Sequence, residues 1–225
     1  MTECIITMAD GGEMRFELFP DRAPITVASF AEVANRGFFD SLAFCRIVEG
    51  YVIQGGSPDN DIMTDSDYHL PGEFRENGYD TGMDHRRGAI SMARDEAPDT
   101  AGTQFFICHR DAHKLDGRYA AFGYMTEGFD VLDRLAALPT SGPDTWNKPL
   151  EMPVMARVRV ISDGALPPVR RLPYGGRRRG NTGMGSTPCA GGRGFEKTWK
   201  HRSDAPACAC RGLPRGWLQP ERRPI

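Results

Sequence analysis

No stretch of this 225-residue chain is apolar for the roughly 20 residues that a membrane-spanning helix needs. The N-terminus, MTECIITMADGG, also lacks the basic and apolar segments of a secretory signal peptide. The cysteines form no regular disulfide framework: they are Cys4, Cys45, Cys108, Cys189, Cys208 and Cys210. These absences argue against a membrane protein and a disulfide-stabilised secreted domain, so we expect a soluble, cytoplasmic protein with free thiols.

A recognisable metal or cofactor site is missing as well. Cys208 and Cys210 form a Cys-Ala-Cys sequence with only His201 nearby. A structural zinc site needs four such ligands, usually as two spaced pairs. We therefore expect neither a bound metal nor a cofactor.

Charge is divided unevenly along the chain, although the total is only −2. Residues 1–165 carry 15 Lys and Arg against 27 Asp and Glu, whereas residues 166–225 carry 13 against 3. The second part, called here the C-terminal tail, also holds 10 Gly and 8 Pro and few aliphatic residues. Such a composition buries too little apolar surface to offset the entropy of ordering. We predict one domain over residues 1–165 and a disordered basic tail.

An alternative gives the tail a role in binding RNA or another anion. Arg170, Arg171 and Arg177–Arg179 would then contact phosphate groups. Disorder with nonspecific charge explains the same residues, so we regard nucleic-acid binding as the weaker hypothesis.

Within the domain, short strand patterns outnumber helical ones. Strands are expected near residues 4–8, 14–19, 89–93, 104–108 and 155–161, and as two runs within residues 44–57 that Gly50 separates. Helical periodicity occurs twice, after Pro24 as far as Gly37 and from Gly128 to Leu138. The polar stretch between Gly56 and Arg87 is long enough to be functional or packed on itself. Many short strands with two helices favour a closed antiparallel β-barrel.

The segment FCRIVEGYVIQGGS, residues 44–57, places an arginine and a glutamine among apolar residues. Since side chains alternate along a strand, Phe44 and Arg46 should share one face, and Arg46 and Gln54 should converge. In the run GTQFFIC, Phe105 and Phe106 should face opposite ways. We therefore predict a binding surface in which a guanidinium lies beside an apolar floor.

Four motifs occur in the order typical of one family. They are FCRIVEGYVIQGGS at 44–57, SMAR at 91–94, GTQFFIC at 102–108 and LDGRYAAFG at 115–123. With them the chain resembles, over about residues 1–164, the cyclophilins, which are peptidyl-prolyl cis/trans isomerases. PGEF at 71–74 and the loop 95–101 resemble the bacterial branch. The resemblance implies an eight-stranded barrel capped by two helices, with a substrate groove on its outer surface.

The resemblance also implies roles for individual residues. Arg46 would stabilise the twisted X-Pro amide, with Gln54 orienting a substrate carbonyl. Tyr51 and Phe106 would join them in the catalytic site. The remaining substrate-binding residues would be Val52 and Leu115 in the proline pocket, Tyr119 at its edge, and Ala93 and Arg94 along the flanking peptide. The reaction would be isomerisation of X-Pro bonds in protein clients, without covalent chemistry.

Several positions depart from the family pattern. Cys45 replaces a common histidine, Tyr51 a phenylalanine, Val52 a methionine, Arg94 an asparagine and Tyr119 a histidine. In addition, Lys114 occupies the place of a tryptophan that helps hold cyclosporin in sensitive members. Because the pocket stays apolar, we expect activity to survive and cyclosporin to bind weakly.

Two rival interpretations remain for these residues. Arg46 could be a solvated strand arginine, and Val52, Phe106 and Leu115 could be ordinary barrel core. The protein, which we expect to be a monomer, could also be a module that binds proline peptides, or a chaperone-like scaffold, with negligible turnover. The side-chain environment of Arg46 and a rate measurement separate these cases.

Overall fold

The computed structural model describes residues 1–173 of the chain. Its strands are β1 (Thr2–Met8), β2 (Glu13–Leu18), β3 (Phe44–Val48), β4 (Val52–Gly55), β5 (Tyr68–His69), β6 (Ala89–Met92), β7 (Phe105–Cys108), β8 (Ala121–Glu127), β9 (Met155–Ser162) and β10 (Leu172–Pro173). The two α-helices are α1 (Pro24–Asn35) and α2 (Phe129–Ala136), and the short 3-10 helices are η1 (Arg75–Asn77), η2 (His113–Leu115) and η3 (Pro143–Thr145). Both predicted helices and all seven predicted strands are therefore present.

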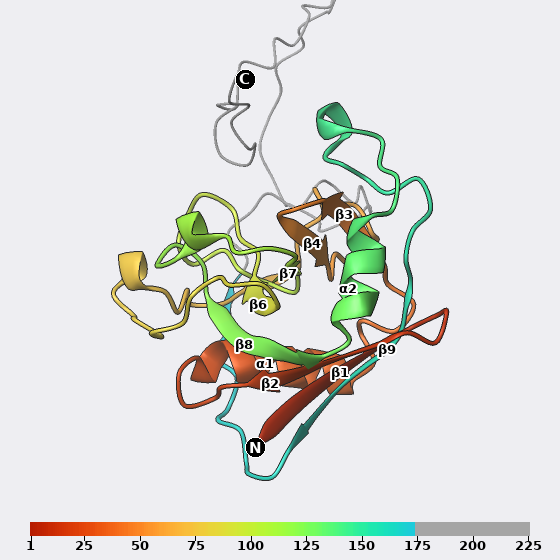
Figure 1. The fold of residues 1–225 in the computed structure, drawn as a ribbon. Helices are drawn as coiled ribbons and strands as arrows, with labels where there is room; N and C mark the ends of the chain where they lie inside the picture. Colours follow the sequence, from red (N-terminus) through yellow and green to blue (C-terminus); the bar gives the residue numbers. More distant parts are fainter. Residues whose placement is uncertain (174–225) are drawn as a thin grey trace, which may run out of the picture. The chain divides into compact units, whose positions relative to one another are not determined.

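Eight of the strands form one curled antiparallel sheet in the order β3-β4-β7-β6-β8-β2-β1-β9 (Figure 1). The two end strands, β3 and β9, are not joined by a ladder in the part that the structure describes. One isolated bridge, Ala43 with Val154, lies between them. Pro153 precedes β9 and has no N–H to donate, which limits pairing at this seam. The predicted mainly β fold is confirmed, but the predicted closure of the barrel is overstated.

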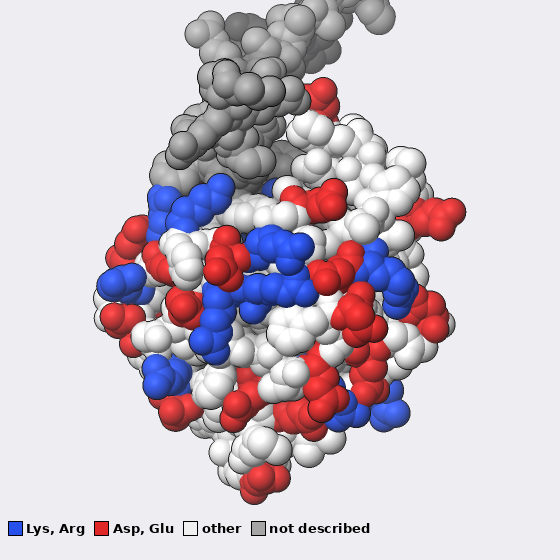
Figure 2. All heavy atoms as spheres, viewed as in Figure 1, with Lys and Arg blue, Asp and Glu red and all other residues white. Residues whose placement is uncertain are grey.

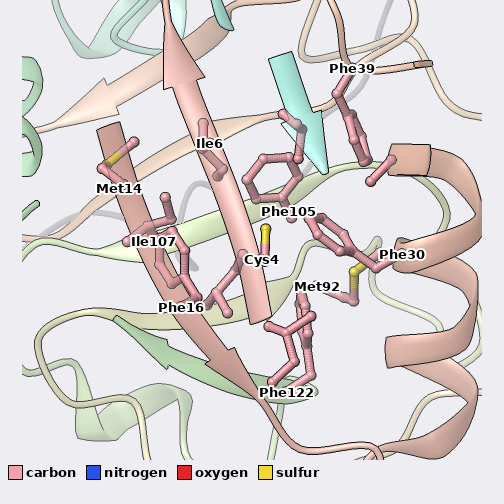
Figure 3. Close-up of a cluster of buried hydrophobic side chains, with 14 of the residues drawn as sticks. Cys4, Ile6, Met14, Phe16, Phe30, Phe39, Met92, Phe105, Ile107 and Phe122 are labelled. Carbon is pink, nitrogen blue, oxygen red and sulfur yellow. The ribbon is translucent and has the colours of Figure 1, made fainter. Parts of the chain in front are cut away.

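The hydrophobic core fills the inside of this curl. Met14, Phe16 and Leu18 alternate inward along β2, as the sequence predicts, and each is at most 2 % exposed. Phe30 of α1 points into the sheet, where its ring lies 5.3 Å from the ring of Phe105 and 5.1 Å from that of Phe122 (Figure 3). Burying each such side chain contributes about 1.5–3 kcal/mol. The apolar stripe of α1 thus closes the core from one side.

The N-terminus of α1 is capped from a distant part of the chain. Pro24 supplies the first turn, but Ala23 at the cap position offers no side-chain acceptor. The carboxylate of Glu73, which is 2 % exposed, instead accepts bonds from Ile25 N at 3.0 Å and from Thr26 N at 2.7 Å. The loop that follows β4 is therefore fixed to the start of α1.

Packing against the domain continues past the boundary predicted at Ala165. Leu166 and Val169 contact the core cluster, and β10 pairs with β5. Arg171 lies 3.1 Å from the Glu32 carboxylate, so its charge is paired within the domain. The predicted boundary is thus too early by the residues up to Pro173. The rest of the tail, including Arg177–Arg179 and the three distal cysteines, lies outside the described residues.

Charge on the visible face of the domain is unevenly spread. In Figure 2 basic side chains gather in a band over β6 and β7, and acidic side chains surround it. A local positive region therefore exists on a domain whose net charge is negative. No helix within residues 1–173 is long and apolar enough to cross a membrane.

Candidate active site

A row of side chains crosses four neighbouring strands on the face of the sheet opposite the core. Arg46 of β3 pairs with Gln54 of β4, Gln54 pairs with Phe106 of β7, and Phe106 pairs with Ser91 of β6. Residues directly opposite each other on paired strands share a face. The fold therefore brings the predicted Arg46, Gln54 and Phe106 together.

The next row of paired residues along the same strands faces the core. On β3 a β-bulge lies between this row and the row that contains Arg46. Phe44 pairs with Gly55, and Gly55 pairs with Phe105, whose ring lies 6.0 Å from that of Phe44. The register shifts between Phe44 and Arg46, so Cys45 is an extra residue on β3. The prediction that Phe44 and Arg46 share a face is therefore wrong, because simple alternation ignores a bulge. The opposite orientation of Phe105 and Phe106 is confirmed.

The side chain of Gln54 forms hydrogen bonds with both Arg46 and Gln104. Arg46 Nη1 donates to Gln54 Oε1 at 3.3 Å, and Gln54 Nε2 donates to Gln104 Oε1 at 2.9 Å. Gln104 Nε2 in turn donates to the carbonyl oxygen of Thr64 at 2.9 Å. This chain of bonds limits the rotamers of Arg46. The sequence analysis missed Gln104, although it lies two residues before Phe106 and hence on the same face.

Arg46 is a buried cation without an anionic partner. Its exposed fraction is 3 %, and within residues 1–173 no carboxylate lies in ion-pair distance. Desolvation by burial lowers the pKa of the guanidinium, against the charges of Tyr51 and Tyr119, which raise it. The pKa of a free arginine is so high that the group stays charged. The interpretation of Arg46 as a solvated strand arginine is therefore wrong.

Two buried side-chain atoms of the described chain have no hydrogen-bond partner, and both are in this site. They are Arg46 Nε and the hydroxyl oxygen of Tyr51. A buried polar atom without a partner costs about 1–3 kcal/mol. Such a cost is commonly retained where a ligand supplies the missing acceptor.

The apolar part of the site is distinct from the barrel core. Val52, Phe106 and Leu115 are buried at 3 %, 5 % and 6 % exposure, yet none belongs to the core cluster. The Tyr119 ring meets Phe106 edge to face, with centroids 5.7 Å apart. These three side chains are therefore buried outside the main core cluster, and Tyr119 contacts the ring of Phe106.

The side chain of Arg94 stabilises the segment that carries Tyr119. Its Nε and Nη2 both donate to the carbonyl oxygen of Arg118, at 3.0 and 2.7 Å. Its guanidinium lies 4.8 Å from the ring centroids of both Phe74 and Tyr119. The amide of the preceding Ala93 is also engaged, because it donates to the carbonyl of Gln104 at 3.0 Å. The side chain of Arg94 thus contacts other residues of the domain and fixes the position of Tyr119.

A cavity of about 240 Å³ has Tyr119 in its lining. The other lining residues are Phe74, Arg75, residues 80–84, Asp116 and Gly117. Tyr119 thus contacts the ring of Phe106 and also borders this cavity.

His85 was missed by the sequence analysis, because it stands in a polar stretch without periodicity. Its side chain is fully buried and stacks on Phe106 with ring centroids 5.9 Å apart and an interplanar angle of 20°. Nδ1 lies 3.0 Å from Asp116 Oδ1, and Nε2 lies 3.0 Å from Ser91 Oγ. A carboxylate accepts only, so Nδ1 carries the proton and Nε2 accepts from Ser91. His85 thus supports the floor of the site from behind.

This burial predicts a pH-dependent stability. Desolvation by burial lowers the pKa of His85 below its ordinary value, although its bond to Asp116 acts in the opposite direction. The folded state therefore binds fewer protons than the unfolded state, and stability is lost as pH falls below about 6.5. We expect the free energy of unfolding to decrease between pH 7 and pH 5, and to decrease less steeply in His85→Gln. Urea denaturation at several pH values measures both slopes.

Exposed His113 acts with the opposite sign, because its bond to Asp116 raises its pKa. Because it shares Asp116 with His85, both slopes are also measured in a His113→Gln background. Identical slopes for the two proteins would show that His85 is not the titrating group.

The described domain is a curled antiparallel sheet with two α-helices and an arginine beside an aromatic floor on its outer face, which agrees with the fold that the sequence motifs predict. Comparison with known proteins identifies the family. The model of the family "Cyclophilin type peptidyl-prolyl cis-trans isomerase/CLD" matches residues 4–160. The chain belongs to this family and is an enzyme of the peptidyl-prolyl cis-trans isomerase type.

Named relatives agree with this assignment. Peptidyl-prolyl cis-trans isomerase B of Bacillus subtilis is 40% identical over 129 residues, which cover 57% of this chain and 87% of the relative. A Helicobacter pylori isomerase is 38% identical over 55% of this chain and 74% of its own length. These values support the predicted resemblance to bacterial members. A crystal structure of a Cryptosporidium parvum cyclophilin, determined with the dipeptide Ala-Pro, is 27% identical with a TM-score of 0.63, covering 72% of this chain and 99% of that one.

Proposed function

We propose that Arg46 catalyses rotation about X-Pro peptide bonds by stabilising the twisted amide. Amide resonance sets a barrier of about 18–20 kcal/mol, so unaided isomerisation takes tens to hundreds of seconds. Rotation removes the conjugation and returns a lone pair to the proline nitrogen. A fixed guanidinium donating to that nitrogen lowers the barrier without a nucleophile or a proton transfer.

The observation that carries this proposal is the unpartnered Nε of Arg46. Gln54 orients the guanidinium through Nη1 and leaves Nε as a buried donor beside the Phe106 floor. A donor inside an apolar site interacts more strongly with developing charge than a donor in water. Val52, Leu115, Phe106 and Tyr119 would bind the proline ring, with Ala93 and Arg94 beside the flanking peptide. Substrates would be proline-containing peptides, as the Ala-Pro dipeptide with the Cryptosporidium relative supports.

Isomerisation of an Ala-Pro peptide by the full-length chain tests this function. We expect the rate of cis/trans exchange, measured by exchange NMR, to rise in proportion to enzyme concentration. A peptide that binds, as judged by chemical-shift changes, without any faster exchange would establish the rival binding module instead.

Weak inhibition by cyclosporin is a further expectation. The exposed Lys114 occupies the position where the family resemblance places a tryptophan, and its ammonium lies 4.6 Å from the ring centroid of Tyr51. A hydrated ammonium offers less apolar surface than an indole. We expect half-maximal inhibition only at micromolar cyclosporin in the exchange assay. Nanomolar inhibition would contradict this expectation, and Lys114→Trp should increase the affinity.

We also propose that the protein acts as a monomer in the cytoplasm. The three cysteines of the described domain are free and buried. Burial raises the pKa of the Cys45 thiol to about 11 and that of Cys108 to about 12, so both stay protonated and unreactive. Free inert thiols support a reducing compartment.

A further inference from the structure

Tyr51 carries a polar group that the proposed mechanism does not use. Its side chain belongs to a residue that is 9 % exposed, and its hydroxyl has no hydrogen-bond partner. Burial raises the pKa of this phenol to about 12, so it remains a proton donor at neutral pH. Tyr51 directly precedes Val52, the first residue of β4 and a member of the proposed proline pocket. The hydroxyl is therefore an available donor at the proline site.

Lys114 places a second unused donor over the same ring. Its ammonium lies 4.6 Å from the centroid of Tyr51. Lys114 is exposed, and no ion pair of the described domain includes it, whereas the adjacent His113 is paired with Asp116 at 3.0 Å. Because Lys114 itself is exposed, water competes with its contact to the ring, and the ammonium is free to turn toward a better partner. The Tyr51 hydroxyl and the Lys114 ammonium thus place two donors at one ring, and neither has an anionic partner in the described domain.

We propose that Tyr51 and Lys114 form a subsite that selects peptides with a carboxylate side chain directly beside the proline. This inference rests on the proposed function and adds a substrate class to it. The ammonium pairs with the carboxylate at the rim, and once it leaves the ring the phenol donates a hydrogen bond to the same group. Charge-assisted bonds of this kind are stronger than neutral ones. The basic band over β6 and β7 in Figure 2 favours the approach of an acidic peptide.

Matched peptides test this selection. We would compare Ala-Pro peptides with Glu directly before or directly after the proline against the corresponding Gln peptides, using the full-length chain and exchange NMR. For at least one of the two positions we expect kcat/KM to be about 3- to 10-fold higher with Glu at low salt. The preference should shrink at 0.5 M NaCl, where the Debye length falls to a few Å.

Two variants assign the preference to the subsite. Lys114→Gln should bring the Glu-to-Gln ratio close to one, and Tyr51→Phe should reduce it by about half or more. Arg36→Gln is the matched control, because it removes an exposed positive charge directly after α1 that is paired with Glu32. That variant should keep the wild-type ratio.

The outcomes separate this inference from the proposed function. Equal kcat/KM for Glu and Gln peptides at both positions, with catalysis intact, would overturn the inference alone. A preference that persists in Lys114→Gln would also overturn it. No acceleration of any peptide would reject the proposed function itself.

Discussion

Replacing Arg46 with alanine is expected to lower kcat/KM for X-Pro isomerisation by about 100- to 1000-fold. Removing one preorganised donor from a desolvated site costs about 2.7–4 kcal/mol of transition-state stabilisation. The guanidinium is 3 % exposed and has no carboxylate to share its charge within the described domain, so its interaction with the substrate is poorly screened. The exchange rate of an Ala-Pro peptide at saturating and subsaturating concentrations measures the effect.

Two further variants show whether catalysis needs the guanidinium of Arg46 or only a positive charge. Arg46→Lys keeps the charge but loses the planar fork that both donates to Gln54 and presents Nε, so we expect activity to remain at least about 10-fold below wild type. Arg36→Ala, which removes the exposed arginine that follows α1, should retain full activity. Equal rates for wild type and Arg46→Ala would end the claim that Arg46 is the catalytic group.

Replacing Glu73 with alanine is expected to destabilise the fold by about 3 kcal/mol. This carboxylate is buried and accepts from Ile25 N, Thr26 N and Thr26 Oγ1, the last at 2.7 Å. Its loss leaves amides at the first turn of α1 without a partner and removes a negative charge from the positive end of the helix dipole. Urea denaturation at pH 7 measures the change.

The matched control for this experiment is Glu76→Ala. Glu76 is exposed on η1 and lies 3.5 Å from Arg118, so its loss should cost less than about 0.5 kcal/mol. Glu73→Gln keeps the shape and one acceptor and should lose about half as much stability as Glu73→Ala. A loss below about 1 kcal/mol for Glu73→Ala would mean that water caps the helix as well as the carboxylate does.

Local patterns in the sequence predicted most of the secondary structure and much of the site. Pro24 and Gly37 enclose α1, and the alternation in β2 and β7 assigns Phe16 and Phe105 to the core and Phe106 to the opposite face. These signals work because the periods of 2 and 3.6 residues follow from backbone geometry alone. The catalytic assignments came from the resemblance of whole motifs, and they stay predictions until Arg46 is tested.

The bulge at Cys45 shows where such local reasoning fails. One extra residue reverses the faces of all side chains beyond it, and no neighbour within β3 signals its presence. The residues that pack against Phe106 and bond to one another could not be predicted from the sequence either. His85, Ser91 and Asp116 come from three separate segments, and only folding brings them into hydrogen-bond distance.

By itself, the sequence determined both α-helices and seven of the strands, the apolar faces of β2 and β7, and the family motifs that name Arg46, Gln54 and Phe106. The tertiary structure alone decided that the sheet curls without a closing ladder, that Glu73 caps a helix about fifty positions earlier, and that Arg46 is buried without an anion. The physical reason is how far apart in the sequence the interacting residues lie. Periodicity is a property of neighbouring residues, whereas burial and hydrogen-bond partners depend on segments that meet only when the chain folds.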